Sequence, residues 1–177
     1  MDFSLIQKLG KEEKYASQRD EYQVTLAPKT VGEIRAESPE ILTNTVVIHF
    51  YPNDWDVYKK VVREIDGKKV EVPYDPNAKS VLQGVAELVG KFGAARVIIE
   101  GHTDASMRGQ VPEALVKELS LNRAQAVREA LVREYKLDPT RLMVDGMGWD
   151  RPADPKNPFN HAKNRRVEVK VYPAEVE

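Results

Sequence analysis

The sequence predicts an α+β domain in which helices pack on one face of a sheet of about four strands. From residue 46 onward, short β-branched segments alternate with longer segments whose apolar residues recur at helical spacing. The last apolar segment alternates with polar residues, which is typical of a strand with one solvated face. Neither an internal repeat nor a low-complexity segment interrupts the 177 residues. These observations favour one sheet-and-helix domain with an appended N-terminal segment.

We expect residues 1–45 to form an N-terminal extension and residues 46–173 to form the domain. Alternating apolar residues predict a strand at residues 22–26 of the extension. A capping box that begins at Thr30 predicts a short helix up to Arg35.

The first predicted strand of the domain is the β-branched, aromatic-ended run Val46–Phe50. A turn signal follows at residues 52–54, and residues 55–65 fit either a helix or an irregular excursion. Asp66-Gly67 separates two short apolar segments, which predicts a β-hairpin with a type I′ turn.

Two helices are predicted after the hairpin. The first opens at Pro76-Asn77 and ends at Gly90 or Gly93, because five apolar residues share one face between these points. The second runs from about Ser120 to Tyr135 and turns its small and aliphatic residues inward. The remaining predicted elements are strands at residues 96–100, 142–144 and 166–172, with a loop rich in proline and asparagine before the last.

Composition excludes several classes of function. The hydrophobic fraction of 41% and the charged fraction of 31% are ordinary for a globular protein, and the net charge of -1 argues against nucleic-acid binding. The chain has no cysteine, which excludes disulfides and cysteine-ligated metals. No segment approaches the roughly 20 apolar residues that span a bilayer, so we expect no direct membrane insertion. The N-terminus lacks the features of a signal peptide, and we expect a mature or excised piece of a longer protein.

An acid and a base stand at positions that suggest a ligand site. Asp104 follows an apolar strand and the flexible Gly101, and strand ends of this kind often meet ligands. If Ser120 caps the second helix, Arg123 lies at its third position, where the helix dipole disfavours a cation. Such a fixed anion and cation suit a ligand with both an ammonium and a carboxylate. A purely structural reading remains open, in which Asp104 caps a turn or pairs with Arg123.

Several ordered motifs carry a resemblance to a known family. They are Gly101-His102-Thr103-Asp104, Leu119-Ser120 with Arg123-Ala124, Gly146 to Gly148, and Asn164-Arg165-Arg166-Val167-Glu168. Together they resemble the OmpA-like peptidoglycan-binding domain of outer-membrane proteins, peptidoglycan-associated lipoproteins and flagellar stator proteins. The resemblance covers roughly residues 46–172 and implies a two-layer sandwich with a mixed sheet, in the order βαβαββ.

The resemblance implies a non-catalytic anchor that binds peptidoglycan in the periplasm of a Gram-negative-type bacterium, without a cofactor or a metal. Meso-diaminopimelate of the stem peptide keeps a free ammonium and carboxylate at its side-chain end. In this reading Asp104 accepts the ammonium, and Arg123 offers a two-pronged donor to the carboxylate.

Further pocket residues follow from the same resemblance. Thr103 and Asn53 are expected to line the pocket, and one of Arg165 and Arg166 is expected to face it. The structural alternative for these two arginines is a solvated strand edge and a salt bridge to Glu168.

The sequence also departs from the family pattern. Val116 stands where the family usually has asparagine, and the segment between Asp104 and Leu119 is a few residues longer than usual. Residues 55–73 are an elaboration between the first strand and the first helix. Residues 1–45 resemble the junction in larger periplasmic proteins, where a solute-binding domain precedes the OmpA-like domain.

Three other readings stay open beside the peptidoglycan anchor. An enzyme is disfavoured, because the three histidines lack metal-ligand spacing and neither a nucleophile elbow nor a phosphate loop is present. A degenerate module would use the fold for protein–protein contact, with Trp149 and Phe159 as anchors. A homodimer built through residues 1–45 is the third.

Overall fold

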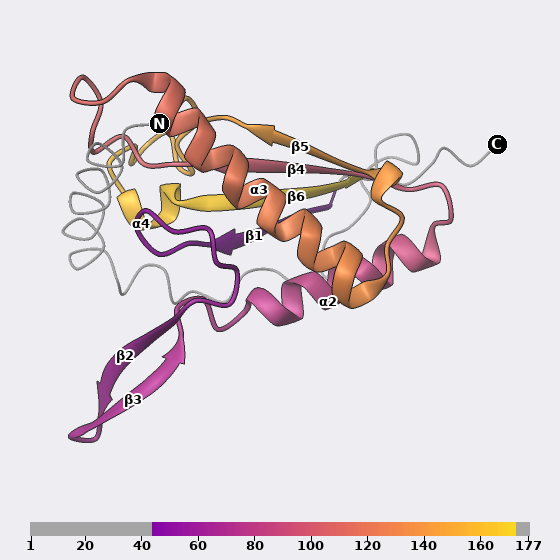
Figure 1. Ribbon diagram of the computed structural model, residues 1–177, viewed down its shortest axis with the longest axis horizontal. Coiled ribbons are helices and arrows are strands. Elements are labelled where there is room, and N and C mark those ends of the chain that lie inside the picture. The colour runs from indigo at the N-terminus through magenta and orange to yellow at the C-terminus, as the bar shows by residue number, and fades with distance from the viewer. Residues whose placement is uncertain (1–43, 173–177) are drawn as a thin grey trace.

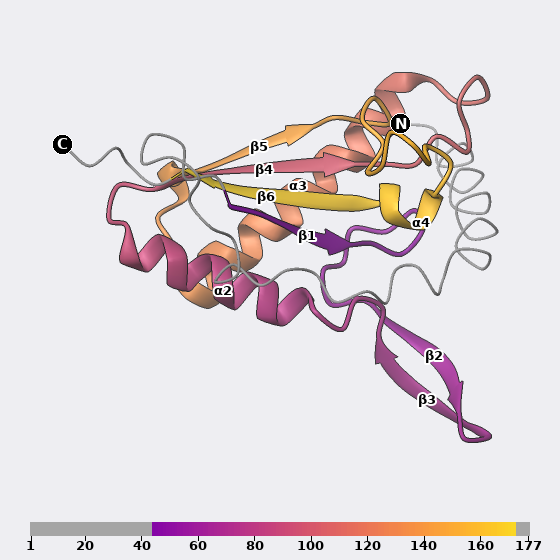
Figure 2. The same cartoon turned by 180° about the vertical axis from the view of Figure 1, so that it is seen from behind.

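A four-stranded mixed sheet forms the centre of the computed structural model, which describes residues 44–172. The strands lie in the order β1-β6-β4-β5, and only the β4–β5 pair is parallel. The predicted four-stranded mixed sheet of an α+β fold is therefore confirmed (Figures 1 and 2). The bounds of the strands are β1 (Asn44–His49), β4 (Arg96–His102), β5 (Leu142–Gly146) and β6 (Arg166–Tyr172).

Two long helices, α2 (Ala78–Lys91) and α3 (Glu113–Tyr135), cover one face of this sheet, as Figure 1 shows from the helix side. Apolar residues of both helices pack against the inward residues of β1, β4 and β6 in one continuous core. The helix α2 begins after Asn77 as predicted, but it runs through Gly90 and ends at Lys91. Two short helices, η2 (Pro139–Arg141) and α4 (His161–Asn164), precede β5 and β6.

Among residues 44–172 the strands β2 (Lys60–Ile65) and β3 (Lys68–Pro73) pair only with each other, and they project away from the four-stranded sheet (Figures 1 and 2). Asp66 and Gly67 both have positive φ angles, 51° and 75°, as a type I′ turn requires. The predicted hairpin is thus confirmed. Residues 60–65 form a regular strand, so neither the helix nor the irregular excursion considered for residues 55–65 describes them.

Helix α3 begins at Glu113 and not at Ser120, which corrects the sequence prediction. Arg123 therefore lies in the middle of a helix, and its backbone N–H group is not one of the free donors of a helix start. The argument from an unfavourable helix dipole at Arg123 was wrong.

A second apolar cluster accounts for the early start of α3. It contains Met107, Val111, Val116 and Leu119, with Trp149 packed against it. These residues bury the first turns of α3 against the longer segment after Asp104, and Pro112 stands just before the helix. Val116, the departure from asparagine, is fully buried in this cluster. Trp149 is half-buried against this cluster, so part of its ring is already used in packing.

Two glycines allow α3 to lie directly on the sheet. Gly101 of β4 and Gly146 of β5 are neighbours in the parallel register. A Cβ atom at Gly101 would overlap the carbonyl oxygen of Ser120, and one at Gly146 would lie 2.7 Å from the carbonyl oxygen of Lys117. The glycines of both sequence motifs thus set the position of α3 and of the side chains it carries.

The predicted strand at residues 22–26 and the helix at residues 30–35 lie outside the described residues. The boundary of the domain at residue 45 stays a prediction, and β1 begins at Asn44. Among residues 44–172, no helix has both the length and the apolar character needed to cross a bilayer.

Candidate functional site

Arg123 of α3 is buried at one end of the sheet. Its Nε donates to the carbonyl oxygen of Asp54 at 2.9 Å, and its two terminal nitrogens donate to carbonyl oxygens of His102 at 3.1 Å and Tyr51 at 3.3 Å. Asn53 has a φ of 54° in the turn between Tyr51 and Asp54, so this left-handed residue helps to aim both carbonyl groups. The guanidinium group therefore joins α3, the end of β4 and the turn after β1.

Asp104 lies just beyond the end of β4 and is fully buried. Its Oδ1 accepts hydrogen bonds from the backbone N–H of Ser106 at 2.9 Å and from the Ser106 hydroxyl at 2.5 Å. Its Oδ2 lies 3.4 Å from Nη1 of Arg165. Asp104 therefore caps a turn, as its structural reading predicted, and the arginine that contacts its carboxylate is Arg165, where that reading named Arg123.

Arg165 is the arginine of the Arg165-Arg166 pair that the structure brings to Asp104. It is fully buried, and its remaining contacts fix its orientation. Its Nε donates to the carbonyl oxygen of Phe50 at 3.2 Å, and Nη2 donates to the hydroxyl of Tyr74 at 3.1 Å. The backbone N–H of Phe50 donates in turn to the carbonyl of Arg165 at 2.9 Å.

Arg166 points into a different cluster. Its Nε donates to Oε2 of Glu168 at 2.8 Å, and Nη2 donates to the carbonyl oxygen of Arg151 at 3.1 Å. Adjacent residues at the start of a strand turn their side chains to opposite sides, which separates Arg165 from Arg166. The structural alternative, a salt bridge to Glu168, therefore holds for Arg166.

Two buried polar atoms near Asp104 lack a hydrogen-bond partner among residues 44–172: Oγ1 of Thr103 and Nδ1 of His161. Thr103 is almost fully buried, and its backbone N–H donates to the carbonyl of Gly148. Nδ1 of His161 lies 3.8 Å from Oδ1 of Asp104. Buried polar groups in native proteins nearly always have a partner, so these two atoms mark a place where a ligand can supply one.

Glu100, His102 and Glu168 form the only group of potential metal ligands among the described residues, with ligand atoms within 4.8 Å of one another. Both carboxylates already have cationic partners, since Lys170 Nζ lies 2.7 Å from Glu100 and Arg166 pairs with Glu168. Burial, and then the charges of Arg166, Lys170 and Arg151, lower the pKa of His102 to about 3. This cluster is a charge-balanced ion-pair network around a neutral imidazole.

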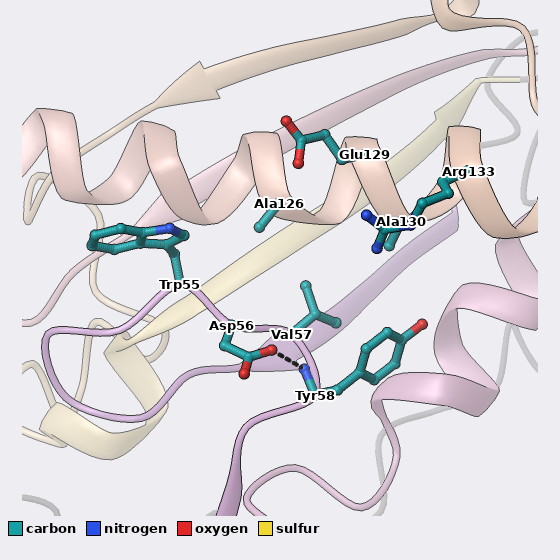
Figure 3. A pocket seen from close by; sticks show the side chains of 8 residues that line it. All are labelled: Trp55, Asp56, Val57, Tyr58, Ala126, Glu129, Ala130 and Arg133. Atoms are coloured by element: carbon teal, nitrogen blue, oxygen red, sulfur yellow. Dashed lines mark hydrogen bonds between the residues drawn. The ribbon is translucent and has the colours of Figure 1, made fainter.

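A shallow hollow of about 120 Å³ opens between the turn after β1 and helix α3 (Figure 3). Trp55 and Tyr58 flank it, while Ala126 and Ala130 of α3 form part of its lining. Because Trp55 follows Asp54 directly, the hollow begins beside the turn that binds Arg123.

Three contributors to the site were missed by the sequence analysis: Ser106, Tyr74 and His161. A serine two residues after an aspartate is a common turn signal and identifies Ser106 in retrospect. Tyr74 comes from the segment after the hairpin and His161 from a helix of one turn, so no local pattern connects either of them with Asp104.

The fold and the site define a class: a two-layer α+β domain with a buried carboxylate and two buried guanidinium groups at the end of its sheet. The OmpA family matches residues 69–166, more than half of the sequence, and the chain belongs to this family. The match includes Asp104, Arg123, Arg165 and Arg166.

Outer membrane protein Omp38 of Acinetobacter baumannii is 36% identical over 115 residues, which cover 64% of this chain and 30% of Omp38. The chain thus matches less than a third of that relative's length. Among solved structures, the OmpA-like domain of FopA1 from Francisella tularensis superposes with a TM-score of 0.56 at 16% identity, covering 80% of this chain and 81% of that one. The peptidoglycan-associated lipoprotein of Burkholderia pseudomallei gives a TM-score of 0.51 at 19% identity, with coverage of 71% and 88%. These two structures share the fold of the chain.

Proposed function

We propose that this domain binds peptidoglycan non-covalently through the diaminopimelate of the stem peptide and anchors an envelope protein of a Gram-negative-type bacterium to the cell wall. The observation that carries the proposal is the buried Asp104 at the same end of the sheet as the buried Arg123, in a chain of the OmpA family. A solved neighbour is named as a peptidoglycan-associated lipoprotein, and the relative Omp38 is named as an outer membrane protein.

The charges around the site support a ligand with two opposite charges. Asp104 accepts the ammonium of diaminopimelate, and the guanidinium group of Arg123 supplies the positive charge opposite its carboxylate. Arg165 contributes by pairing with the carboxylate of Asp104 and holding it in place, with Nη1 3.4 Å from Oδ2. The hydroxyl of Thr103, which lacks a partner among the described residues, is a further donor to the ligand.

The test is calorimetric titration with a soluble diaminopimelate muropeptide, compared with a muropeptide that carries lysine at the same position. Lysine lacks the extra carboxylate, so Arg123 loses its partner and binding weakens. We expect saturable binding of the first ligand, and a loss of about 10- to 100-fold in Asp104→Asn, since a hydrogen bond to a charged group contributes about 1.5–3 kcal/mol.

Asp145→Asn is the matched control, because this carboxylate lies on β5 and is exposed. It should bind the diaminopimelate muropeptide as the parent does. Equal binding by the parent and Asp104→Asn, or equal binding of both muropeptides, contradicts the proposal.

A second candidate function, protein–protein contact, rests on the projecting hairpin. Val62 and Ile65 expose 67% and 48% of their surface there. Among residues 44–172 these two strands pair with no third strand, and a two-stranded hairpin is marginally stable alone, so a partner would cover it. Sedimentation of the parent and of Val62→Lys distinguishes self-association through the hairpin from a monomer.

A further inference from the structure

The carboxylate of Asp104 has little free capacity to accept hydrogen bonds from a ligand. A carboxylate offers about four acceptor positions. The backbone N–H and the hydroxyl of Ser106 occupy two on Oδ1, and Arg165 approaches Oδ2. An ammonium group has three N–H donors, so a ligand ammonium that reaches Asp104 needs at least one further acceptor nearby.

His161 supplies an acceptor atom at the right place. Nδ1 of its ring is buried, has no hydrogen-bond partner among residues 44–172, and lies 3.8 Å from Oδ1 of Asp104. Two acceptors at this separation can both receive hydrogen bonds of about 2.9 Å from one nitrogen between them. The His161 side chain is 12% exposed whereas that of Asp104 is not exposed, so part of the ring reaches solvent while the carboxylate does not.

The short helix α4 holds the ring in this position. The side chain of Asn160 accepts from the backbone N–H of Lys163 and caps the helix. The backbone N–H of Arg165 donates to the carbonyl of His161 at 3.1 Å. Arg165 therefore fixes both members of the pair, Asp104 through its side chain and His161 through its backbone.

We propose that His161 is the second acceptor for the ligand ammonium, with Nδ1 accepting one N–H while Oδ1 of Asp104 accepts another at the position that the Ser106 hydroxyl gives up when it rotates away. This inference rests on the proposed function and adds a residue that determines specificity to it. The carboxylate supplies charge, and the imidazole supplies a directed lone pair. The pair selects a primary ammonium over an acylated amine, which has only one N–H donor and no charge.

The experiment compares His161→Phe and His161→Gln with the parent on two ligands: the diaminopimelate muropeptide, and the same muropeptide with its side-chain-end amine removed. Phenylalanine keeps an aromatic ring without an acceptor, and glutamine keeps an acceptor. We expect His161→Phe to bind the first ligand about 10-fold more weakly, with His161→Gln within about threefold of the parent. For the deaminated ligand, followed by NMR titration, all three proteins should have the same affinity.

An equal loss for both ligands in His161→Phe means that the ring has only a structural role and overturns the inference. Unchanged binding of the first ligand by His161→Phe, alongside a loss in Asp104→Asn, also overturns it while leaving the proposed function intact. If the parent binds neither muropeptide, the proposed function and this inference both fail. Thermal unfolding of each variant shows whether the substitutions leave the fold intact.

Discussion

Two ionic clusters lie at the same end of the sheet, and they differ in how their charges are satisfied. In the first, fully buried Asp104 contacts Arg165, and Nδ1 of His161 beside it lacks a hydrogen-bond partner within residues 44–172. In the second, Glu100 and Glu168 are partly accessible and pair with Lys170 and Arg166.

Both clusters take residues from the same two sequence motifs, since His102 and Asp104 flank Thr103, and Arg165 adjoins Arg166. Charged residues of one sequence motif therefore serve in different clusters. The second cluster balances its own charges across strands β4 and β6. Both clusters hold buried polar atoms that lack a hydrogen-bond partner among residues 44–172: Oγ1 of Thr103 and Nδ1 of His161 near the first, and Oε1 of Glu100 and both ring nitrogens of His102 in the second. The first differs in that its carboxylate and the guanidinium group paired with it are both fully buried.

Among substitutions in the two clusters, Arg165→Ala should cause the largest loss of stability and of muropeptide binding. Removing one partner of a buried ion pair leaves the other charge unpaired and typically costs about 3–5 kcal/mol of unfolding free energy. We expect a loss of that size, measured by urea unfolding at pH 7, together with loss of muropeptide binding.

Arg166→Ala is the control for Arg165→Ala. Its partner Glu168 is 19% exposed and can be solvated, so we expect a smaller loss of stability and unchanged muropeptide affinity. If the two alanine variants were equally destabilised and equally impaired in binding, the distinction between the clusters would be wrong.

Gly101→Ala should act on the first cluster indirectly, through the position of α3. The new methyl group meets the backbone of Ser120, which cannot rotate away, so α3 must shift. Overpacking of this kind typically costs about 1–3 kcal/mol. We also expect weaker muropeptide binding because Arg123 moves with the helix. Gly90→Ala is the control: nothing lies near its Cβ position in α2, and alanine there should stabilise the protein by about 0.5–1 kcal/mol.

The sequence predicts some elements of this molecule and not others. Local patterns sufficed for the strands and for the Asp66-Gly67 hairpin, because alternation and turn chemistry act over a few residues. They failed at the start of α3, since the burial of Val116 depends on Met107 and Trp149, which lie outside the helix.

The residues of the candidate site also fall into those that the sequence predicts and those that it does not. Asp104 and Arg123 follow from motif spacing, and the structure places both in buried positions at the end of the sheet. The choice between Arg165 and Arg166 depends on where α4 ends and β6 begins, and the sequence does not determine that residue. His161 was missed because only the three-dimensional fold brings a one-turn helix to the end of β4.

The second cluster should make the stability of the domain depend on pH. The pKa of His102 is lowered to about 3 in the folded state, against about 6.5 when unfolded. Below pH 6.5 the unfolded state therefore binds more protons, and the domain loses up to about 1.4 kcal/mol of stability per pH unit until the pH approaches 3. At pH 5 this amounts to about 2 kcal/mol. Urea unfolding of the parent and His102→Gln between pH 7 and pH 4 measures it. A variant with the same pH slope as the parent would contradict this role of His102.

Lys170→Gln should have the smallest effect at neutral pH. The ion pair with Glu100 lies at a partly exposed position, where such pairs contribute about 0–1 kcal/mol. Lys170 also helps to lower the pKa of His102, so its removal makes the imidazole easier to protonate. The variant should consequently lose less stability than the parent as the pH falls from 7 to 5. Urea unfolding of the parent and Lys170→Gln at both pH values tests this. If the stability lost through the substitution stayed the same or grew at pH 5, Lys170 and His102 would not be coupled. Muropeptide affinity should not change, because Lys170 belongs to the cluster that balances its own charges.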